Sequence, residues 1–210
     1  MSGRLVVLAS GGGSNLQALI DEIAAGALDV QITLVIVNRK AALAGERAAR
    51  AGIPYRYEPL RPWLERGLDR DDYDAHLAQI IAADRPDILI MAGWMHICSD
   101  AFVAQFPNQI MNVHPALLPS FPGAHAIRDA LAYGVKVTGV TVMYVWPGGL
   151  TAFDNGPIIL QAAVPVEDND TEETLGARLH TVEHRLLPEA VRLHLAGRLR
   201  VVERRVQQQD

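Results

Sequence analysis

The sequence has a single cysteine, no long apolar run and no excess of positive charge. Cys98 is the only cysteine among 210 residues, so an internal disulfide is impossible and a reducing cytoplasm is the expected setting. The amino-terminal segment enters a short apolar run without the features of a signal peptide. Apolar runs such as Ile88 to Trp94 are far shorter than the roughly 20 residues that span a bilayer. We therefore expect a cytoplasmic protein without a membrane partner.

The charge balance disfavours a nucleic-acid partner. Lys and Arg number 19 against 24 Asp and Glu, which gives a net charge of −5. Proteins that hold nucleic acids neutralise many phosphates through a basic face, and this composition does not favour one. Half of the residues are hydrophobic, and a chain of 210 residues suits one core. We expect one domain over residues 1–210 that does not bind nucleic acid.

Short apolar runs alternate with amphipathic segments along most of the chain. Repeated alternation of this kind predicts the α/β class, with a mostly parallel, Rossmann-like sheet flanked by helices on both faces. The strands are predicted at 5–8, 32–37, near 55, and at 88–91, 110–113, 139–145 and 157–164. The helices are predicted at 14–25, 42–51, 71–83, 100–106 and 125–133, with a long last helix from about 171 to 196.

The loop from Gly11 to Asn15 lies between the first predicted strand and the first predicted helix. Backbone N–H groups and the helix dipole at such a junction favour a bound anion such as phosphate. The loop is not a Walker A motif, because no lysine follows the glycines, and Leu16 replaces the third glycine of the dinucleotide fingerprint. The alternative is a simple turn capped by Ser14. Arg70 is a candidate clamp for the same anion, or else a solvated surface residue.

Asn112 and His114 end a predicted strand, where alternation points both side chains to the same side. The carboxyl end of a parallel strand is where open α/β sheets place their sites. An amide donor can stabilise an oxyanion and an imidazole can move protons, so the pair suits acyl chemistry. Asp154, in the long loop before the last predicted strand, is a candidate carboxylate for orienting His114, although Asp-Asn-Gly is also an ordinary turn sequence.

A metal centre is the weaker interpretation. The seven histidines show no close ligand spacing, and Cys98 has no second cysteine to pair with. Cys98 is equally weak as a nucleophile and is predicted to be a small packing residue. We expect no metal cofactor.

The sequence resembles the phosphoribosylglycinamide formyltransferase family from Leu5 to about Gly197. The matching segments, in the order usual for that family, are Gly12-Gly13-Ser14-Asn15-Leu16-Gln17, Met91-Ala92-Gly93-Trp94-Met95, Asn112-Val113-His114-Pro115-Ala116-Leu117-Leu118-Pro119, Phe121-Pro122-Gly123, Thr138-Gly139-Val140-Thr141-Val142 and Asp154-Asn155-Gly156-Pro157-Ile158-Ile159. The resemblance implies the formyltransferase fold, with an antiparallel carboxyl-terminal addition and a long helix. It also implies transfer of the formyl group of 10-formyltetrahydrofolate to the amine of 5-phosphoribosylglycinamide, without a metal.

The resemblance also implies a role for each site residue. The half at about 1–100 would hold the phosphate and ribose, through Gly12, Gly13, Ser14, Asn15 and Arg70, with Glu183 near the ribose. The half at about 101–200 would carry the folate and catalytic chemistry. Met95, His96, Ile97, Cys98 and Asn112 would contact the folate, together with the loop around Asp154. Asn112, His114 and Asp154 would be catalytic.

Three departures from the family pattern bear on folate binding and rate. Met143 occupies the place of a family histidine, so that group is absent or replaced by another such as Thr141. The loop from Met143 to Asp154 is about four residues longer than is usual, with 146–149 as the insertion. His96 replaces a frequent arginine and removes a fixed charge. We expect a slower or differently tuned site.

Three alternatives remain open at this stage. One is another 10-formyltetrahydrofolate enzyme, either a hydrolase or a formyltransferase acting on an amino sugar or methionyl-tRNA. The hydrolase and the tRNA enzyme normally carry an extra domain, for which this chain has no room. A second is a ligand-binding homologue with reduced turnover, and ligand binding compared with turnover separates it from an enzyme. The third concerns assembly, either a monomer or a homodimer.

Overall fold

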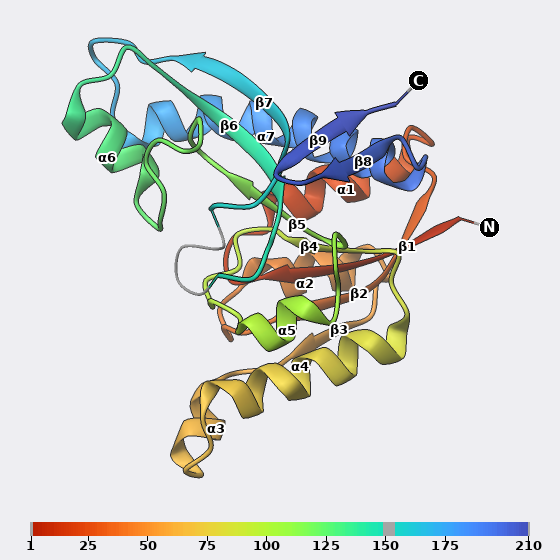
Figure 1. The fold of residues 1–210 in the computed structure, drawn as a ribbon. Coiled ribbons are helices and arrows are strands. Elements are labelled where there is room, and N and C mark those ends of the chain that lie inside the picture. Colours follow the sequence, from red (N-terminus) through yellow and green to blue (C-terminus); the bar gives the residue numbers. More distant parts are fainter. Residues whose placement is uncertain (1, 149–153, 210) are drawn as a thin grey trace.

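The computed structural model describes residues 2–148 and 154–209, which form one mixed sheet covered by helices on both faces (Figure 1). Residues 149–153, which include Gly149 of the expected insertion, lie outside the described residues. The strands are β1 (Gly3–Ala9), β2 (Val30–Val37), β3 (Tyr55–Tyr57), β4 (Ile88–Met91), β5 (Ile110–His114), β6 (Val137–Tyr144), β7 (Ile158–Pro165), β8 (Leu199–Val202) and β9 (Arg205–Gln208). The helices are α1 (Ser14–Ala24), α2 (Leu43–Arg50), α3 (Arg61–Glu65), α4 (Arg70–Asp84), α5 (Asp100–Ala104), α6 (Ala126–Tyr133) and α7 (Glu172–Leu195).

The sheet order is β3-β2-β1-β4-β5-β6-β7. Strands β1 to β5 pair in parallel, whereas β6 pairs with β5 and β7 in the antiparallel sense. The predicted mostly parallel sheet with an antiparallel addition and a long last helix is therefore confirmed. The short helix α3 and the hairpin of β8 and β9 were not predicted. The predicted last helix ends near residue 196, and the hairpin follows it.

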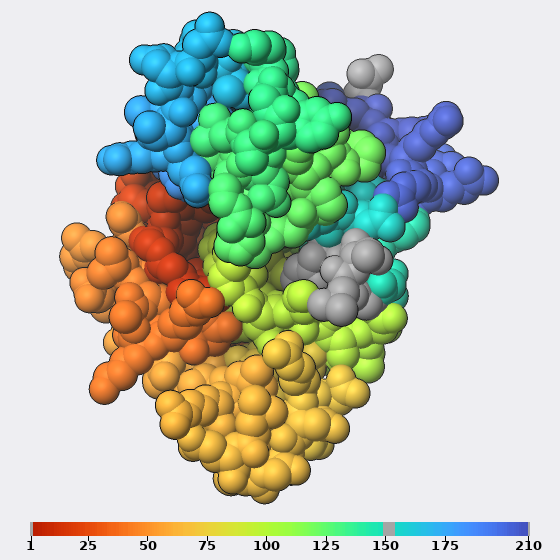
Figure 2. Space-filling view, turned by 90° about the vertical axis from the view of Figure 1, so that its left-hand side faces the viewer, coloured from red at the N-terminus to blue at the C-terminus, as the bar shows by residue number. Residues whose placement is uncertain are grey.

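The surface at the carboxyl edge of the parallel strands is hollowed (Figure 2). The segment that follows β1, in red to orange, faces the green segment that follows β5 across this hollow. Because carboxyl ends of parallel strands meet at one edge, the loops after β1, β4 and β5 lie together there. This edge is therefore where a site is expected.

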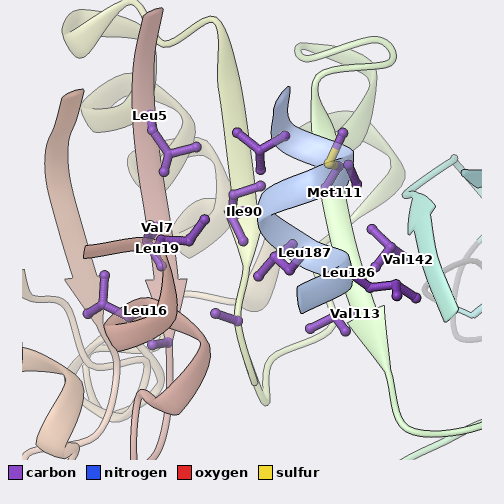
Figure 3. Close-up of a cluster of buried hydrophobic side chains, with 14 of the residues drawn as sticks. Leu5, Val7, Leu16, Leu19, Ile90, Met111, Val113, Val142, Leu186 and Leu187 are labelled. Atoms are coloured by element: carbon purple, nitrogen blue, oxygen red, sulfur yellow. The ribbon is translucent and has the colours of Figure 1, made fainter. Parts of the chain in front are cut away.

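Alternate residues of the central strands pack into two separate hydrophobic cores, one on each face of the sheet. Leu5 and Val7 of β1 pack with α1, α2 and α7 on one face, while Val6 and Leu8 pack with α4 and α5 on the other. Figure 3 shows the first cluster, with Leu187 of α7 lying over the sheet. Burial on both faces explains why these strands read as continuous apolar runs. Both faces hold the central strands rigid, so their carboxyl ends form a fixed platform.

The long helix α7 begins where the sequence predicted a cap. Thr171 accepts a hydrogen bond from the Thr174 N–H, and the Thr174 side chain accepts one from the Thr171 N–H. This reciprocal capping box satisfies two N–H groups at the helix start. No helix among residues 2–148 and 154–209 is both long enough and apolar enough to cross a membrane.

Candidate active site

Asn112 and His114 lie on β5 at the carboxyl edge of the sheet. In the strand register Asn112 lies between Met91 and Met143, and His114 lies beside Thr141. The intervening Val113 packs into the core formed with α1 and α7, so Asn112 and His114 point away from that core. The two polar side chains thus lie on one side of the strand, as the alternation predicts.

Both ring nitrogens of the buried His114 lie close to an oxygen. Nε2 is 2.8 Å from the carbonyl oxygen of Phe121, and Nδ1 is 3.3 Å from Oδ1 of Asp154. Asp154 is itself held, because its Oδ2 accepts a hydrogen bond of 2.6 Å from the Gly123 N–H. A carboxylate in this position orients the imidazole ring. The structure therefore brings together the His and Asp that the sequence could only suggest as partners.

Thr141 and Met143 both face this site from β6. The Thr141 hydroxyl donates to the Ala116 carbonyl at 2.7 Å and accepts from the Leu118 N–H and the Gln161 amide. One donor and two acceptor sites are the full capacity of a hydroxyl, so Thr141 cannot also serve a substrate. Met143 is completely buried. The suggestion that Thr141 replaces the missing histidine is therefore disfavoured, and its observed role is to hold the loop after His114.

One position of the glycine loop, Gly13, requires a residue without a side chain because of its packing. Gly13 has φ +70°, and a Cβ there would lie 2.8 Å from Cα of Ala44. Helix α1 begins at Ser14 with Gly13 as its N-cap, and among the described residues no side chain caps it. Ser14 therefore does not cap the helix, and the choice between a simple turn and an anion-binding loop stays a prediction. The first N–H groups of α1 keep the capacity to bind an anion.

Asn15 connects the glycine loop to α7. Its Nδ2 donates to Oε2 of Glu183 at 2.8 Å, and both side chains are buried. Nδ1 of His180 lies 3.0 Å from the same oxygen, and this hydrogen bond raises the pKa of His180 above its ordinary value. Within the described part of the chain, Oδ1 of Asn15 is buried with no hydrogen-bond partner. A buried unsatisfied amide oxygen is costly, so it marks a position where a ligand hydroxyl would be stabilised.

Arg47, which the sequence analysis did not single out, contacts the glycine loop directly. Its Nε donates to the Gly12 carbonyl at 2.8 Å, and Nη1 lies 3.0 Å from the Gln17 side chain. No spacing signal marked this residue, because α2 meets α1 only in the folded chain. Arg70, which was singled out, is exposed at the start of α4, on the other face of the sheet. The phosphate role of Arg70 remains a prediction.

The segment after β4 that was predicted to wall the folate pocket has mixed exposure. Met95 and Ile97 are exposed, whereas His96 and Cys98 are buried. His96 Nε2 lies 2.6 Å from Oδ1 of the buried Asp74. Met95 and Ile97 are therefore the side chains of this segment that a ligand can contact. The segment is tied to the glycine loop, because Oγ of Ser10 accepts a 2.7 Å hydrogen bond from the Met95 N–H.

Asp74, His96 and Cys98 offer a carboxylate oxygen, an imidazole nitrogen and a thiol sulfur within 4.8 Å of one another. No sequence spacing indicates this group, because Asp74 lies on α4 whereas His96 and Cys98 lie in the loop after β4. Two ligands at zinc distances of about 2.0–2.1 Å in a tetrahedron lie roughly 3.3 Å apart. The 2.6 Å separation of His96 and Asp74 is that of a hydrogen-bonded pair instead.

A cavity of about 540 Å³ lies at the opposite edge of the sheet, lined by Gly3, Asp87, Arg192 and His194 among others. It is remote from His114 and from the glycine loop. Cavity size therefore does not locate the polar groups that could carry chemistry here, and the position of those groups at the carboxyl edge is the stronger guide.

Three comparisons with known proteins give consistent results. A family model described as formyl transferase matches residues 3–191. The phosphoribosylglycinamide formyltransferase of Mycobacterium tuberculosis is 45% identical over 188 residues, which cover 90% of this chain and 83% of that protein. The trifunctional purine biosynthetic protein adenosine-3 of Drosophila pseudoobscura pseudoobscura is 43% identical over 201 residues, which cover 95% of this chain but 14% of that protein. The crystal structure of glycinamide ribonucleotide transformylase 1 from Symbiobacterium toebii matches with a TM-score of 0.93 and 43% identity, covering 100% of this chain and 95% of that chain.

Proposed function

Because this chain belongs to the formyl transferase family, and within it to the phosphoribosylglycinamide formyltransferases, we propose that it transfers the formyl group of 10-formyltetrahydrofolate to the amine of 5-phosphoribosylglycinamide. The observation that carries the proposal is the contact of His114 with Asp154 beside Asn112, at the same edge as the glycine loop. Acid–base groups next to an anion-binding loop suit an acyl transfer to a phosphorylated amine.

In this proposal the side chains on β5 handle the reacting carbonyl. The substrate amine attacks the formyl carbon, and the Asn112 amide and the His114 ring donate to the oxygen that becomes negative. His114 Nε2 donates to the Phe121 carbonyl in this structure, so the formyl oxygen would replace that acceptor. Asp154 holds the ring from the Nδ1 side throughout. The bond from the formyl carbon to the folate nitrogen then breaks, and the proton lost by the amine is transferred to that nitrogen.

The two substrates occupy different parts of the site in this proposal. The N–H groups of Gly12, Gly13 and Ser14 bind the phosphate, and the Asn15–Glu183 pair binds the ribose hydroxyls. Oδ1 of Asn15 supports this placement, because it is buried and unsatisfied among the described residues. The folate lies over the segment 95–98. No metal is needed for this chemistry, and we expect a cytoplasmic monomer or homodimer.

Release of tetrahydrofolate tests the proposal directly. Purified protein is given 10-formyltetrahydrofolate with glycinamide ribonucleotide, with the dephosphorylated riboside, or with no acceptor. We expect fast release only with the ribonucleotide, because the glycine loop contributes binding only to the phosphate. Equal release without an acceptor would identify a hydrolase. Binding of the ribonucleotide without release would identify a non-catalytic homologue.

A further inference from the structure

The segment from Trp94 to Cys98 alternates between buried and exposed side chains. Trp94, His96 and Cys98 are at most 6% exposed, whereas Met95 is 56% exposed and Ile97 is 37% exposed. The buried side chains anchor the segment, and the exposed ones form its outer surface. The position of Met95 and Ile97 is therefore set by whatever holds His96 and its neighbours.

Asp74 on α4 holds this segment at two points. Its Oδ1 lies 2.6 Å from His96 Nε2, and its Oδ2 accepts a hydrogen bond of 2.5 Å from the Ser99 N–H. Asp74 is only 1% exposed, while Tyr73 and Leu77 of the same helix are fully buried in the core. Each carboxylate oxygen is thus satisfied, which is the condition under which a buried carboxylate is tolerated. The carboxylate fixes the segment to a helix that cannot shift easily.

Two aromatic rings and the Cys98 thiol lie beside the His96–Asp74 pair. The His96 ring meets Tyr73 and Trp94 edge-on, with ring centroids 5.1 Å and 6.3 Å away. Burial, together with the charge of Asp74, raises the pKa of the Cys98 thiol well above its ordinary value, so the thiol stays neutral. Within the cluster of Asp74, His96 and Cys98, the side chain that is hydrogen-bonded to the carboxylate is therefore His96. Loss of the imidazole would leave a buried carboxylate with one oxygen unpaired.

We propose that Asp74 is a positioning residue for the folate, acting through His96 and Ser99. By fixing the middle of the segment and the residue that follows it, Asp74 holds Met95 and Ile97 as a preformed apolar surface for the ring system of the co-substrate. A preformed surface raises affinity because less ordering is required on binding. This inference rests on the proposed function, and it concerns the folate half of the site and not the glycine loop.

Replacement of His96 separates its hydrogen bond from its volume. His96→Gln keeps an N–H that can donate to Asp74, while His96→Leu has similar size and no donor. We expect His96→Leu to raise KM for 10-formyltetrahydrofolate and Kd for tetrahydrofolate about tenfold, with KM for the ribonucleotide unchanged. His96→Gln should stay within about twofold of the unmodified protein on both constants. A purely structural role would lower both substrate affinities together or only the melting temperature.

Ser99 provides a second matched pair in case His96→Leu does not fold. Ser99 has φ −68°, which proline accepts, so Ser99→Pro removes the N–H that donates to Asp74. Ser99→Ala keeps this N–H and loses only the hydroxyl, which caps α5 by accepting from the Phe102 N–H. We expect Ser99→Pro, and not Ser99→Ala, to raise Kd for tetrahydrofolate, measured by calorimetry.

Three results would overturn the inference. The first is an unchanged folate affinity in both His96→Leu and Ser99→Pro. The second is an equal loss of ribonucleotide affinity in either variant. The third is one equivalent of zinc in the purified protein that disappears in Cys98→Ser, because the cluster would then be a metal centre. Failure of the proposed function is distinct from all three, since it appears as a lack of acceptor-dependent release by the unmodified protein.

Discussion

The two sides of the site differ in the groups that they present: backbone N–H groups on one side and side chains on the other. In the parallel half, the loop after β1 presents backbone N–H groups, and the close packing of Gly13 on Ala44 sets its shape. Where the parallel strands meet the antiparallel ones, the chemistry lies on side chains of β5, which pairs with β6. A backbone site is sensitive to added bulk, whereas a side-chain site is sensitive to the loss of one functional group. Substitutions in the two halves should therefore affect different constants.

The largest effect is expected for His114→Ala. Removal of the imidazole takes away the proton-handling group and leaves Asp154 facing empty space, so kcat should fall by about 10²–10⁴-fold. KM for the ribonucleotide should change little, because the glycine loop is intact. Single-turnover formyl transfer measures the first quantity and ribonucleotide binding the second. Activity within tenfold of the unmodified protein would exclude His114 from the mechanism.

The next largest effect contrasts two glycines. A Cβ on Gly156 would overlap the Tyr144 carbonyl oxygen and lie 2.8 Å from its carbon, whereas a Cβ on Gly12 meets nothing within 4 Å. Gly156→Ala should reduce the free energy of unfolding by about 2–4 kcal/mol and displace Asp154, which lies two residues earlier. Gly12→Ala should leave stability nearly unchanged and raise KM for the ribonucleotide. Denaturant unfolding and initial rates measure the two effects. Equal stability of both variants would contradict the close approach at Gly156.

Much of the fold was predictable because its strands are short and buried. The run Ile88–Met91 has the bounds that apolar pattern alone assigned, and β5 extends the predicted run by one residue, to His114. Parallel strands buried on both faces give continuous apolar runs, which are easily recognised between amphipathic helices. The hairpin of β8 and β9 was missed because its strands have four residues each, with only Leu199, Val201 and Val206 packed against the core between arginine and glutamine.

The contacts of the site were less predictable than its residues. Asn112, His114 and Asp154 carry recognisable chemistry, but only the folded chain shows that Asp154 faces His114 and that Thr141 is fully engaged. The pairing of Asn15 with Glu183 spans most of the chain, and no local period encodes such a distance. Side-chain pairs of this kind depend on how helices pack, which the hydrophobic pattern alone does not specify.

A smaller effect compares Arg47, which contacts the glycine loop, with Arg70, which the resemblance assigns to the phosphate. Arg47 contacts the Gly12 carbonyl, whereas Arg70 begins a helix on the opposite face of the sheet from α1. We expect Arg47→Ala to raise KM for the ribonucleotide about tenfold, because the loop loses a charged hydrogen bond that fixes its shape. Arg70→Ala should raise the same constant less. Initial rates at saturating folate provide the measurement, and a larger effect of Arg70→Ala would support the role implied by the resemblance.

The smallest effect separates two neighbouring histidines on α7. The hydrogen bond to Glu183 raises the pKa of His180, while burial, with Arg47 and His180 nearby, lowers the pKa of His184. Because the folded value for His180 lies above its unfolded value, its contribution to stability is complete below about pH 6.5 and is lost as the pH rises through the raised value. The lowered pKa of His184 has the opposite effect, because protonation of this ring reduces the stability of the folded protein as the pH falls. His180 is half-exposed, so the change in stability is small and NMR titration of the two rings is the sharper measurement.

In Glu183→Gln the pKa of His180 should return toward its ordinary value and that of His184 should fall further, since Glu183 raises both. In the unmodified protein, the pKa values of His180 and His184 should lie on opposite sides of the ordinary value. If both were raised or both were lowered, Glu183 would not organise this side of the glycine-loop site.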